Sequence, residues 1–372
     1  MAGPQRAAGA AHRRAGVPIG LKDRLVALIA RKGPISVADY MAACLHDPAD
    51  GYYAARPALG EAGDFITAPH VSQMFGELMG LWAAEAWARL GRPARVRLVE
   101  LGPGDGTMII DALRAAKAAA GFLAACEVWL IETSGPLQAL QMSALAEADA
   151  PARWAAKLED VPGGAPMIIL ANEFLDCMAV RQAVRVDGRW LERRVGVDEG
   201  GALAFVPGHP HQSVAQVFEE GAVFEWSEDL ADFGRRIGDL VSRATGAALF
   251  IDYGRDAPGH GDTLQALRGH RKEGPLDNPG LADLTAHVDF PAFLEAARAA
   301  GAASAPIRRQ GDFLRSLGIE ARAEALALAR SDRCDLIARQ LARLAGADQM
   351  GDLFKVACIH SQGLAPPGFE AP

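Results

Sequence analysis

The hydrophobic pattern separates a helical first quarter of the chain from a longer region in which strands and helices alternate. Apolar residues recur at the spacing of one helix face over residues 21–30, which predicts a helix there. A second helix is expected to begin near Ser36, with Asp39 in its first turn, and a third to cover residues 71–90. The Gly- and Pro-rich stretch 47–69 between them predicts a loop.

Beyond residue 95, short apolar runs alternate with helical stretches. Helices are expected over residues 107–120 and 136–147. Buried strands are predicted by the apolar runs at 96–101, 128–131, 167–170, 247–251 and 353–359. This alternation is typical of an α/β fold, in which helices cover both faces of a mostly parallel sheet.

Two segments interrupt the alternation. The apolar stretches 180–186 and 190–197 flank Asp187-Gly188, which predicts a β-hairpin inside an insertion at about 177–240. Residues 255–310 are polar and rich in Gly and Pro, and we expect a second insertion that covers the substrate. The predicted core therefore comprises residues 93–254 and 311–372, and a helical region spans 18–92.

Composition narrows the class of protein. Half of the 372 residues are hydrophobic and the net charge is −8, which fits a packed core and disfavours non-specific nucleic-acid binding. No apolar run approaches the roughly 18 residues of a membrane span. The five cysteines are scattered without paired spacing, so we expect a reducing compartment and no metal site. Residues 1–17 carry three arginines and no acid; we expect a disordered tail, with a targeting segment as the alternative.

A glycine-rich turn joins the first predicted strand to a helix and suggests a bound ligand. Glycine lets a ligand approach the backbone closely, and the helix N-terminus presents free N–H groups. A dinucleotide site needs its third glycine where this chain has Thr107, so an NAD(P)-dependent oxidoreductase is the weaker alternative. An acid at the strand end, Glu100, suits the sulfonium and ammonium groups of S-adenosylmethionine (SAM). We expect the cofactor at Glu100, Gly102, Pro103, Gly104, Gly106 and Thr107.

Further polar residues follow the next predicted strands. Glu132, at the end of the second strand, is expected to bind the ribose, and Leu158 and Glu159 to lie near the adenine. Asn172, Glu173 and Asp176 follow the strand at 167–170, where an open α/β sheet has its ligand crevice. Paired carboxylates there can hold the fork of a guanidinium and take the proton released on methyl transfer. The alternative is an acidic loop that caps a helix.

Ordered motifs along most of the chain resemble those of one family. Their ranges are 50–53, 63–69, 72–77, 100–104, 171–174, 251–254, 261–265, 283–290 and 350–355. Together they are similar to the MidA family of class I methyltransferases, whose mitochondrial members are complex I assembly factors that methylate a protein arginine. The resemblance implies a Rossmann-like, seven-stranded core with SAM as cofactor. It also implies a cytoplasmic bacterial protein, with the mitochondrial matrix as the alternative.

The resemblance further implies an activity and a partner. The activity is symmetric dimethylation of an arginine ω-nitrogen, and the partner is the quinone-proximal peripheral subunit of complex I or its bacterial counterpart. Residues implied to contact substrate or cover the cofactor are Asp64, Thr67, Pro69, His270 and His287. The chain departs from the family pattern, which has Glu at His70, Arg at Asp105 and Ala at Cys177. These departures leave open a catalytically weak assembly factor that still binds SAM.

Overall fold

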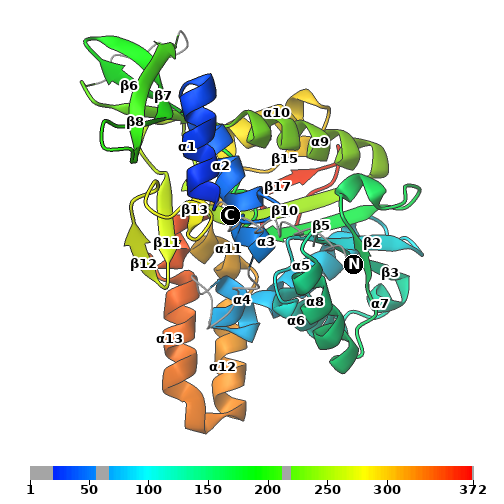
Figure 1. Ribbon diagram of the computed structural model, residues 1–372. Helices are drawn as coiled ribbons and strands as arrows, with labels where there is room; N and C mark the ends of the chain where they lie inside the picture. The colour runs from blue at the N-terminus through cyan, green and yellow to red at the C-terminus, as the bar shows by residue number, and fades with distance from the viewer. Residues whose placement is uncertain (1–19, 56–66, 212–218, 371–372) are drawn as a thin grey trace, which may run out of the picture.

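A computed structural model describes residues 20–55, 67–211 and 219–370 (Figure 1). Its central sheet follows the strand order β15-β17-β10-β5-β2-β3-β4, with the short strands β14 and β16 pairing with β10 and β17. The strands are β2 (Val96–Leu101), β3 (Cys126–Ile131), β4 (Arg153–Ala155), β5 (Met167–Asn172), β10 (Gly246–Arg255), β14 (Val288–Asp289), β15 (Ala303–Ser304), β16 (Arg308–Arg309) and β17 (Phe354–His360). The seven strands on the main path agree with the expected class I methyltransferase sheet.

The connections of this sheet create a switch point between β2 and β5. From β2 the chain builds outward through β3 and β4, and it then returns to place β5 on the other side of β2. These four strands and β10 are mutually parallel, whereas β17 is antiparallel to β10. In an open α/β sheet, the crevice at such a switch point is the usual ligand site. The glycine turn follows β2 and the acidic segment follows β5, so both border this crevice.

Helices cover both faces of the sheet (Figure 1). One face packs against α5 and α6, and the opposite face packs against α9 and α10. The main helices are α4 (Ala68–Val71), α5 (Gln73–Arg89), α6 (Thr107–Ala116), α8 (Gly135–Glu147), α9 (Glu228–Ala244), α10 (Phe290–Ala299), α11 (Gln310–Ser316), α12 (Ile319–Ala329) and α13 (Cys334–Ala345). Shorter turns are α7 (Phe122–Ala125), η2 (Leu158–Asp160), η3 (Ser331–Arg333) and α14 (Met350–Leu353).

Two of these helices differ from our expectation. Residues 228–244 and 290–299 lie largely within the predicted insertions, yet they form α9 and α10 and enclose the core. In α9 the apolar residues Leu230, Phe233, Ile237 and Val241 recur every three or four positions and are all buried. This amphipathic face covers the sheet. The insertions therefore contribute core helices as well as covering elements.

A third apolar cluster joins the N-terminal helices to both insertions. Helices α1 (Leu21–Lys32) and α2 (Val37–His46) pack there, and Ser36 and Asp39 form a capping box that begins α2. The hairpin prediction is confirmed, because Asp187 and Gly188 have φ values of 50° and 73° and join β6 to β7. The remaining elements are α3 (Tyr52–Ala55), β1 (Ile35–Ser36), β6 (Arg181–Val186), β7 (Arg189–Val197), β8 (Leu203–Pro210), β9 (Val223–Trp226), β11 (Gln265–Arg268), β12 (Arg271–Glu273) and β13 (Asp283–Thr285).

Candidate active site

A cavity of about 880 Å³ opens at the carboxyl ends of β2 and β5. This volume lies in the range of small-molecule and cofactor sites. Its wall combines the glycine turn, the ends of β3 and β5, and one side of α9 with α2, α3 and β13 from the third apolar cluster. The cavity therefore lies between the α/β core and the module that the N-terminal helices and the insertions build.

The glycine turn forms one end of the cavity and requires glycine at three positions. Gly102, Gly104 and Gly106 have φ values of 59°, 58° and 89°, which side-chain-bearing residues rarely adopt. Gly102 and Gly104 line the cavity, whereas Pro103, Gly106 and Thr107 do not. A Cβ on Gly106 would lie 3.1 Å from Leu145, so this glycine instead allows α8 to pack against the turn.

Glu100 lies behind the turn rather than in the cavity wall. Its side chain is 2% exposed, and its Oε2 atom has no hydrogen-bond partner among the described residues. Burial, and secondarily the charge of Asp105, raise the pKa of Glu100 to about 8. A buried acid without a cation beside it costs free energy, and nearby cationic groups of a ligand would relieve that cost. The orphaned oxygen thus fits a ligand such as SAM.

Glu132 lines the cavity from the end of β3 and is held in one orientation. Its Oε1 accepts hydrogen bonds from the backbone N–H groups of Thr133 and Ser134, at 2.8 and 2.7 Å. Its Oε2 accepts one from Gln141 at 3.3 Å. A carboxylate has about four acceptor positions, so Oε2 retains capacity for a ribose hydroxyl.

The segment after β4 contributes to the cavity through a residue other than the two we expected. Leu158 is buried among apolar side chains, and Glu159 pairs with Arg236 at 3.2 Å. Neither lines the cavity, but Ala156 does. The small side chain of Ala156 leaves room beside the backbone, which the polarity pattern of the sequence does not indicate.

The acidic segment after β5 presents Glu173 and Asp176 to the cavity. Glu173 has a φ of 50°, uncommon for a residue with a side chain, and its Oε1 accepts hydrogen bonds from Ala68 N–H and the Asn172 amide. The buried Asp252 fixes the segment by accepting from the backbone N–H of Asp176 at 3.2 Å. Asn172 does not itself line the cavity, so in this structure it orients Glu173.

Burial makes these two carboxyls titrate near neutral pH. Burial, followed by the charge of Asp176, raises the pKa of Glu173 to about 7. Burial also raises the pKa of Asp176 to about 6. Groups with such values can accept a proton at physiological pH. Burial raises the pKa of the adjacent Cys177 thiol well above its ordinary value, so Cys177 is a poor nucleophile.

The far end of the cavity contains residues that we did not predict as site residues. Tyr53 on α3 donates a long hydrogen bond of 3.5 Å to Asp283 on β13, and both line the cavity. The Tyr53 ring stacks on His46, with ring centroids 5.7 Å apart. Tyr53 and Asp283 both occur in motifs quoted above, so their positions were marked but their roles were not.

The helix α9 borders the cavity with charged side chains that sequence reasoning also missed. They are Asp229, Asp232, Arg235 and Arg236. Their spacing of one helical turn puts them on one side of α9, opposite its buried apolar face. Periodicity could have identified this polar side, but not which cavity it borders.

The segment before α5 reaches over the glycine turn. Thr67 lines the cavity, whereas Pro69 lies in the short helix α4 outside its wall, and Asp64 lies outside the described residues. The Nε2 atom of His70 lies 2.8 Å from Asp105 Oδ2, and Thr67 Oγ1 lies 2.7 Å from the other ring nitrogen. Two of the positions that depart from the family pattern are therefore in contact with each other.

This contact gives the two departures a common explanation. The resemblance implies Glu and Arg at these two positions, and this chain has His70 and Asp105 there, a base and an acid that contact each other. Burial alone would raise the pKa of Asp105, but hydrogen bonds from His70 and Thr107 outweigh it and lower the pKa to about 2. The pair joins α4 to the glycine turn.

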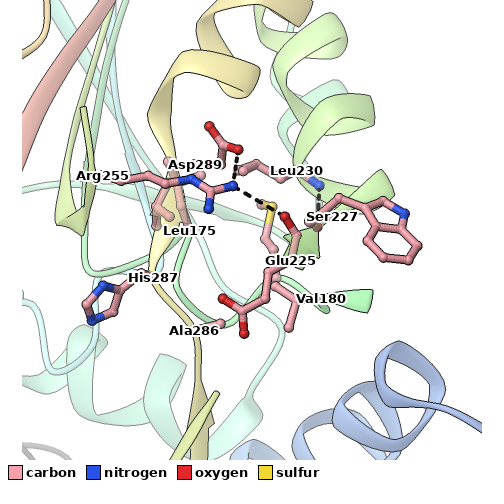
Figure 2. A pocket seen from close by; sticks show the side chains of 12 residues that line it. Leu175, Val180, Glu225, Ser227, Leu230, Arg255, Ala286, His287 and Asp289 are labelled. Carbon is pink, nitrogen blue, oxygen red and sulfur yellow. Dashed lines mark hydrogen bonds and ion pairs between the residues drawn. The ribbon is translucent and has the colours of Figure 1, made fainter. Parts of the chain in front are cut away.

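The two histidines expected to contact substrate do not line the large cavity. His270 is exposed at the turn between β11 and β12. His287 borders a separate space of about 20 Å³, room for about one water molecule, together with Arg255 and Asp289 (Figure 2). Arg255 pairs there with Asp289. The structure therefore brings neither histidine side chain into the wall of the large cavity.

The described residues contain neither a metal site nor a membrane-spanning helix. Among them, no three His, Cys, Asp or Glu side chains are grouped to hold a metal ion. No described helix is long and apolar enough to cross a membrane.

Comparison with known proteins identifies a SAM-dependent methyltransferase, as predicted from the sequence. Residues 78–307 match a family described as "Putative S-adenosyl-L-methionine-dependent methyltransferase". The chain is 35% identical over 361 residues to "Protein arginine methyltransferase NDUFAF7, mitochondrial" of Danio rerio, covering 89% of this chain and 84% of that protein. The human protein of the same name is 36% identical over 322 residues, covering 79% and 72%.

A solved structure extends the likeness to three dimensions. The crystal structure of a Burkholderia thailandensis protein bound to S-adenosyl-homocysteine has a TM-score of 0.82 and 30% sequence identity, covering 94% of this chain and 92% of that one. A native structure from the same organism has a TM-score of 0.81. The expected fold and SAM as cofactor are thereby confirmed, and the NAD(P)-dependent alternative is set aside. The agreement in sequence and in fold places this chain in the MidA family of SAM-dependent methyltransferases.

Proposed function

We propose that this methyltransferase acts on an arginine ω-nitrogen of a protein and produces symmetric dimethylarginine. The observation that carries the proposal is the placement of Glu173, Asp176 and Asp283 in the wall of the same cavity as the glycine turn. An arginine side chain is always charged and presents a rigid fork of N–H donors, which carboxylates match in charge and geometry. The names of the NDUFAF7 relatives support the same acceptor.

Different residues of the site would bind the cofactor, bind the acceptor and accept the proton. SAM supplies an electrophilic methyl group on its sulfonium. The glycine turn and Glu132 would hold the cofactor at one end of the cavity. Glu173 and Asp176 would hold the guanidinium at the other and direct one nitrogen toward the methyl carbon. As the new N–C bond forms and the S–C bond breaks, the nitrogen loses a proton, and Glu173 is placed to accept it.

The surroundings of the acceptor end suit a side chain that enters from a protein. The third apolar cluster brings α2, α3 and β13 over the cavity, and Tyr53 contributes an aromatic ring there. We therefore propose that this module covers the bound arginine. An aromatic face beside carboxylates stabilises a guanidinium through cation–π attraction as well as charge.

The protein substrate we propose is the quinone-proximal peripheral subunit of complex I or its bacterial counterpart, with methylation supporting assembly of the complex. The support is the resemblance to the family and the mitochondrial relatives, which are named protein arginine methyltransferases. The compartment follows the host: bacterial cytoplasm, or the matrix for a mitochondrial protein.

Mass spectrometry of that subunit tests the proposal. The subunit is incubated with SAM and either the native protein or Glu173→Gln, and its arginines are mapped. We expect symmetric dimethylarginine at a defined residue with the native protein only. An unmodified subunit that still binds the protein would instead favour the assembly factor without catalysis. Methylation of a residue other than arginine would refute the proposed acceptor.

A further inference from the structure

One buried amide connects two parts of the cavity wall, the glycine turn and Glu132. Gln141 lies on α8 and is 0% exposed. Its Nε2 atom donates to the carbonyl of Gly104 at 2.8 Å and to Glu132 Oε2 at 3.3 Å. Its Oε1 accepts a hydrogen bond from the indole N–H of Trp154 at 2.8 Å. The side chain thus touches the glycine turn and the acid of β3 at the same time.

The surrounding groups allow only one orientation of this amide. If the oxygen and nitrogen of Gln141 exchanged places, the oxygen would face the Gly104 carbonyl and the Glu132 carboxylate, which are both acceptors. The NH₂ group would then face the Trp154 indole, which is only a donor. Because the side chain is fully buried, no water could relieve these mismatches. Trp154 therefore fixes the direction in which Gln141 presents its two hydrogens.

We propose that Gln141 is a positioning residue for the cofactor: it holds the Gly104 carbonyl and the Glu132 carboxylate at the distance from each other that one SAM molecule requires. Gly104 belongs to the turn after β2, and Glu132 ends β3. The two strands pair directly, and the Gly102 N–H donates to the Ile131 carbonyl at 3.1 Å, so the sheet already aligns their backbones. Gln141 adds the link between the Gly104 carbonyl and the Glu132 side chain, which the sheet does not hold. The packing of α8 against Gly106, where an added Cβ would lie 3.1 Å from Leu145, supplies the rigid base for Gln141.

The inference rests on Glu132 as the ribose ligand, so the experiment tests the two separately. Calorimetry measures the affinity of the full chain for S-adenosylhomocysteine and for an analogue without the ribose 2′-hydroxyl. Glu132→Gln establishes the ribose contact by weakening the parent ligand more than the analogue. Gln141→Leu removes both hydrogen bonds to the wall, and we expect about a tenfold loss of affinity for the parent ligand. The loss for the analogue should be smaller, because it cannot use the oriented carboxylate.

Two further variants keep the test independent of a general loss of stability. Trp154→Phe retains an aromatic ring but removes the N–H that orients Gln141, and we expect a smaller loss of affinity in the same direction. Combined with Gln141→Leu, it should add nothing, since both act through one amide. Met142→Leu on the exposed side of the same helix is the control, as Met142 is 57% exposed.

The outcomes separate a positioning role from a structural one. Equal losses for both ligands in Gln141→Leu would show that Gln141 only supports the fold, and the inference would be overturned. Unchanged affinity in a folded Gln141→Leu would overturn it too, even where Glu132→Gln weakens binding. If Gln141→Leu does not fold, Trp154→Phe decides: a selective loss for the parent ligand supports the inference, and no selectivity refutes it.

Discussion

Replacing Glu100 by Gln is expected to stabilise the folded protein at neutral pH while weakening its hold on SAM. The carboxyl is 2% exposed and one oxygen lacks a hydrogen-bond partner among the described residues, so its charged form is poorly accommodated without a ligand. The glutamine amide has nearly the same shape as the carboxyl and carries no charge at neutral pH. The exchange therefore removes the cost of ionising a buried acid.

The size of the effect follows from the pKa of this carboxyl. Folding raises it from an ordinary value of 4.5 to about 8. Because the folded pKa is the higher one, the stability linked to this group is complete below pH 4.5 and is lost as the pH rises toward 8. At about 1.4 kcal/mol per pH unit, the loss reaches about 3 kcal/mol at pH 7. Glu100→Gln should avoid that loss.

Urea unfolding of the ligand-free protein from pH 5 to pH 8 measures this directly. We expect the native chain and Glu100→Gln to differ little at pH 5 and to diverge as the pH rises, with the variant the more stable. Other buried acids remain in both proteins, so their contributions cancel in the difference. The exposed Glu147, changed to Gln, is the control for losing one carboxylate. A difference in stability that is the same at pH 5 and pH 8 would refute the reasoning.

The same variant tests whether the negative charge of Glu100 contributes to binding of the cationic cofactor. SAM carries a sulfonium and an ammonium, whereas S-adenosylhomocysteine has lost the sulfonium charge. If Glu100 serves the cationic cofactor through its field, Glu100→Gln should weaken binding of SAM more than binding of S-adenosylhomocysteine. Calorimetry at pH 8, where the native carboxyl is substantially ionised, gives the clearest comparison. Equal losses for the two ligands would separate Glu100 from recognition of the sulfonium.

Three other predictions concern the cofactor and acceptor ends of the cavity. Gly104→Val is expected to abolish binding of S-adenosylhomocysteine without unfolding the protein, because Gly104 lines the cavity with a φ of 58° and a branched side chain there would occupy the space beside the turn. Unchanged affinity by calorimetry would contradict this. Glu173→Gln should bind S-adenosylhomocysteine normally but lose methyl transfer, and normal turnover would remove Glu173 from the mechanism. Transfer by the native enzyme should rise between pH 6 and pH 7, as Asp176 and Glu173 ionise with pKa values of about 6 and about 7, and a flat pH profile would argue against carboxylates as the acceptor's ligands.

Local patterns predicted much of the fold because local chemistry decides those features. Three glycines in the turn after β2 have positive φ values, the Asp187-Gly188 turn joins a hairpin, and Ser36 caps α2. Each depends on a few consecutive residues. Continuous apolar runs likewise predicted the strands that are buried on both faces. The amphipathic pattern of α9 is also present in the sequence, but most of this helix follows the hairpin within the segment 177–240 that we predicted to be an insertion.

The composition of the cavity depended on segments that are far apart in the chain. Tyr53 and Asp283 meet across 230 positions, and His70 reaches Asp105 across 35. Conversely, His287 lies in a motif but outside the cavity wall, and His270 is outside that wall as well. A motif marks which residues matter to a family, whereas side-chain direction depends on how whole elements pack.

The sequence by itself determined the strand–turn–helix that we propose as the cofactor site, the acids that follow β3 and β5, and the class of enzyme they imply. Periodicity and turn chemistry depend on a few consecutive residues, so they can be recognised in the sequence alone. Only the tertiary structure decided which residues complete the site. Burial in a shared core brings α2, α3 and β13 to the crevice, sets the pKa values of its carboxyls, and places Gln141 between Gly104 and Glu132. Those properties arise from packing between distant segments, which no local pattern encodes.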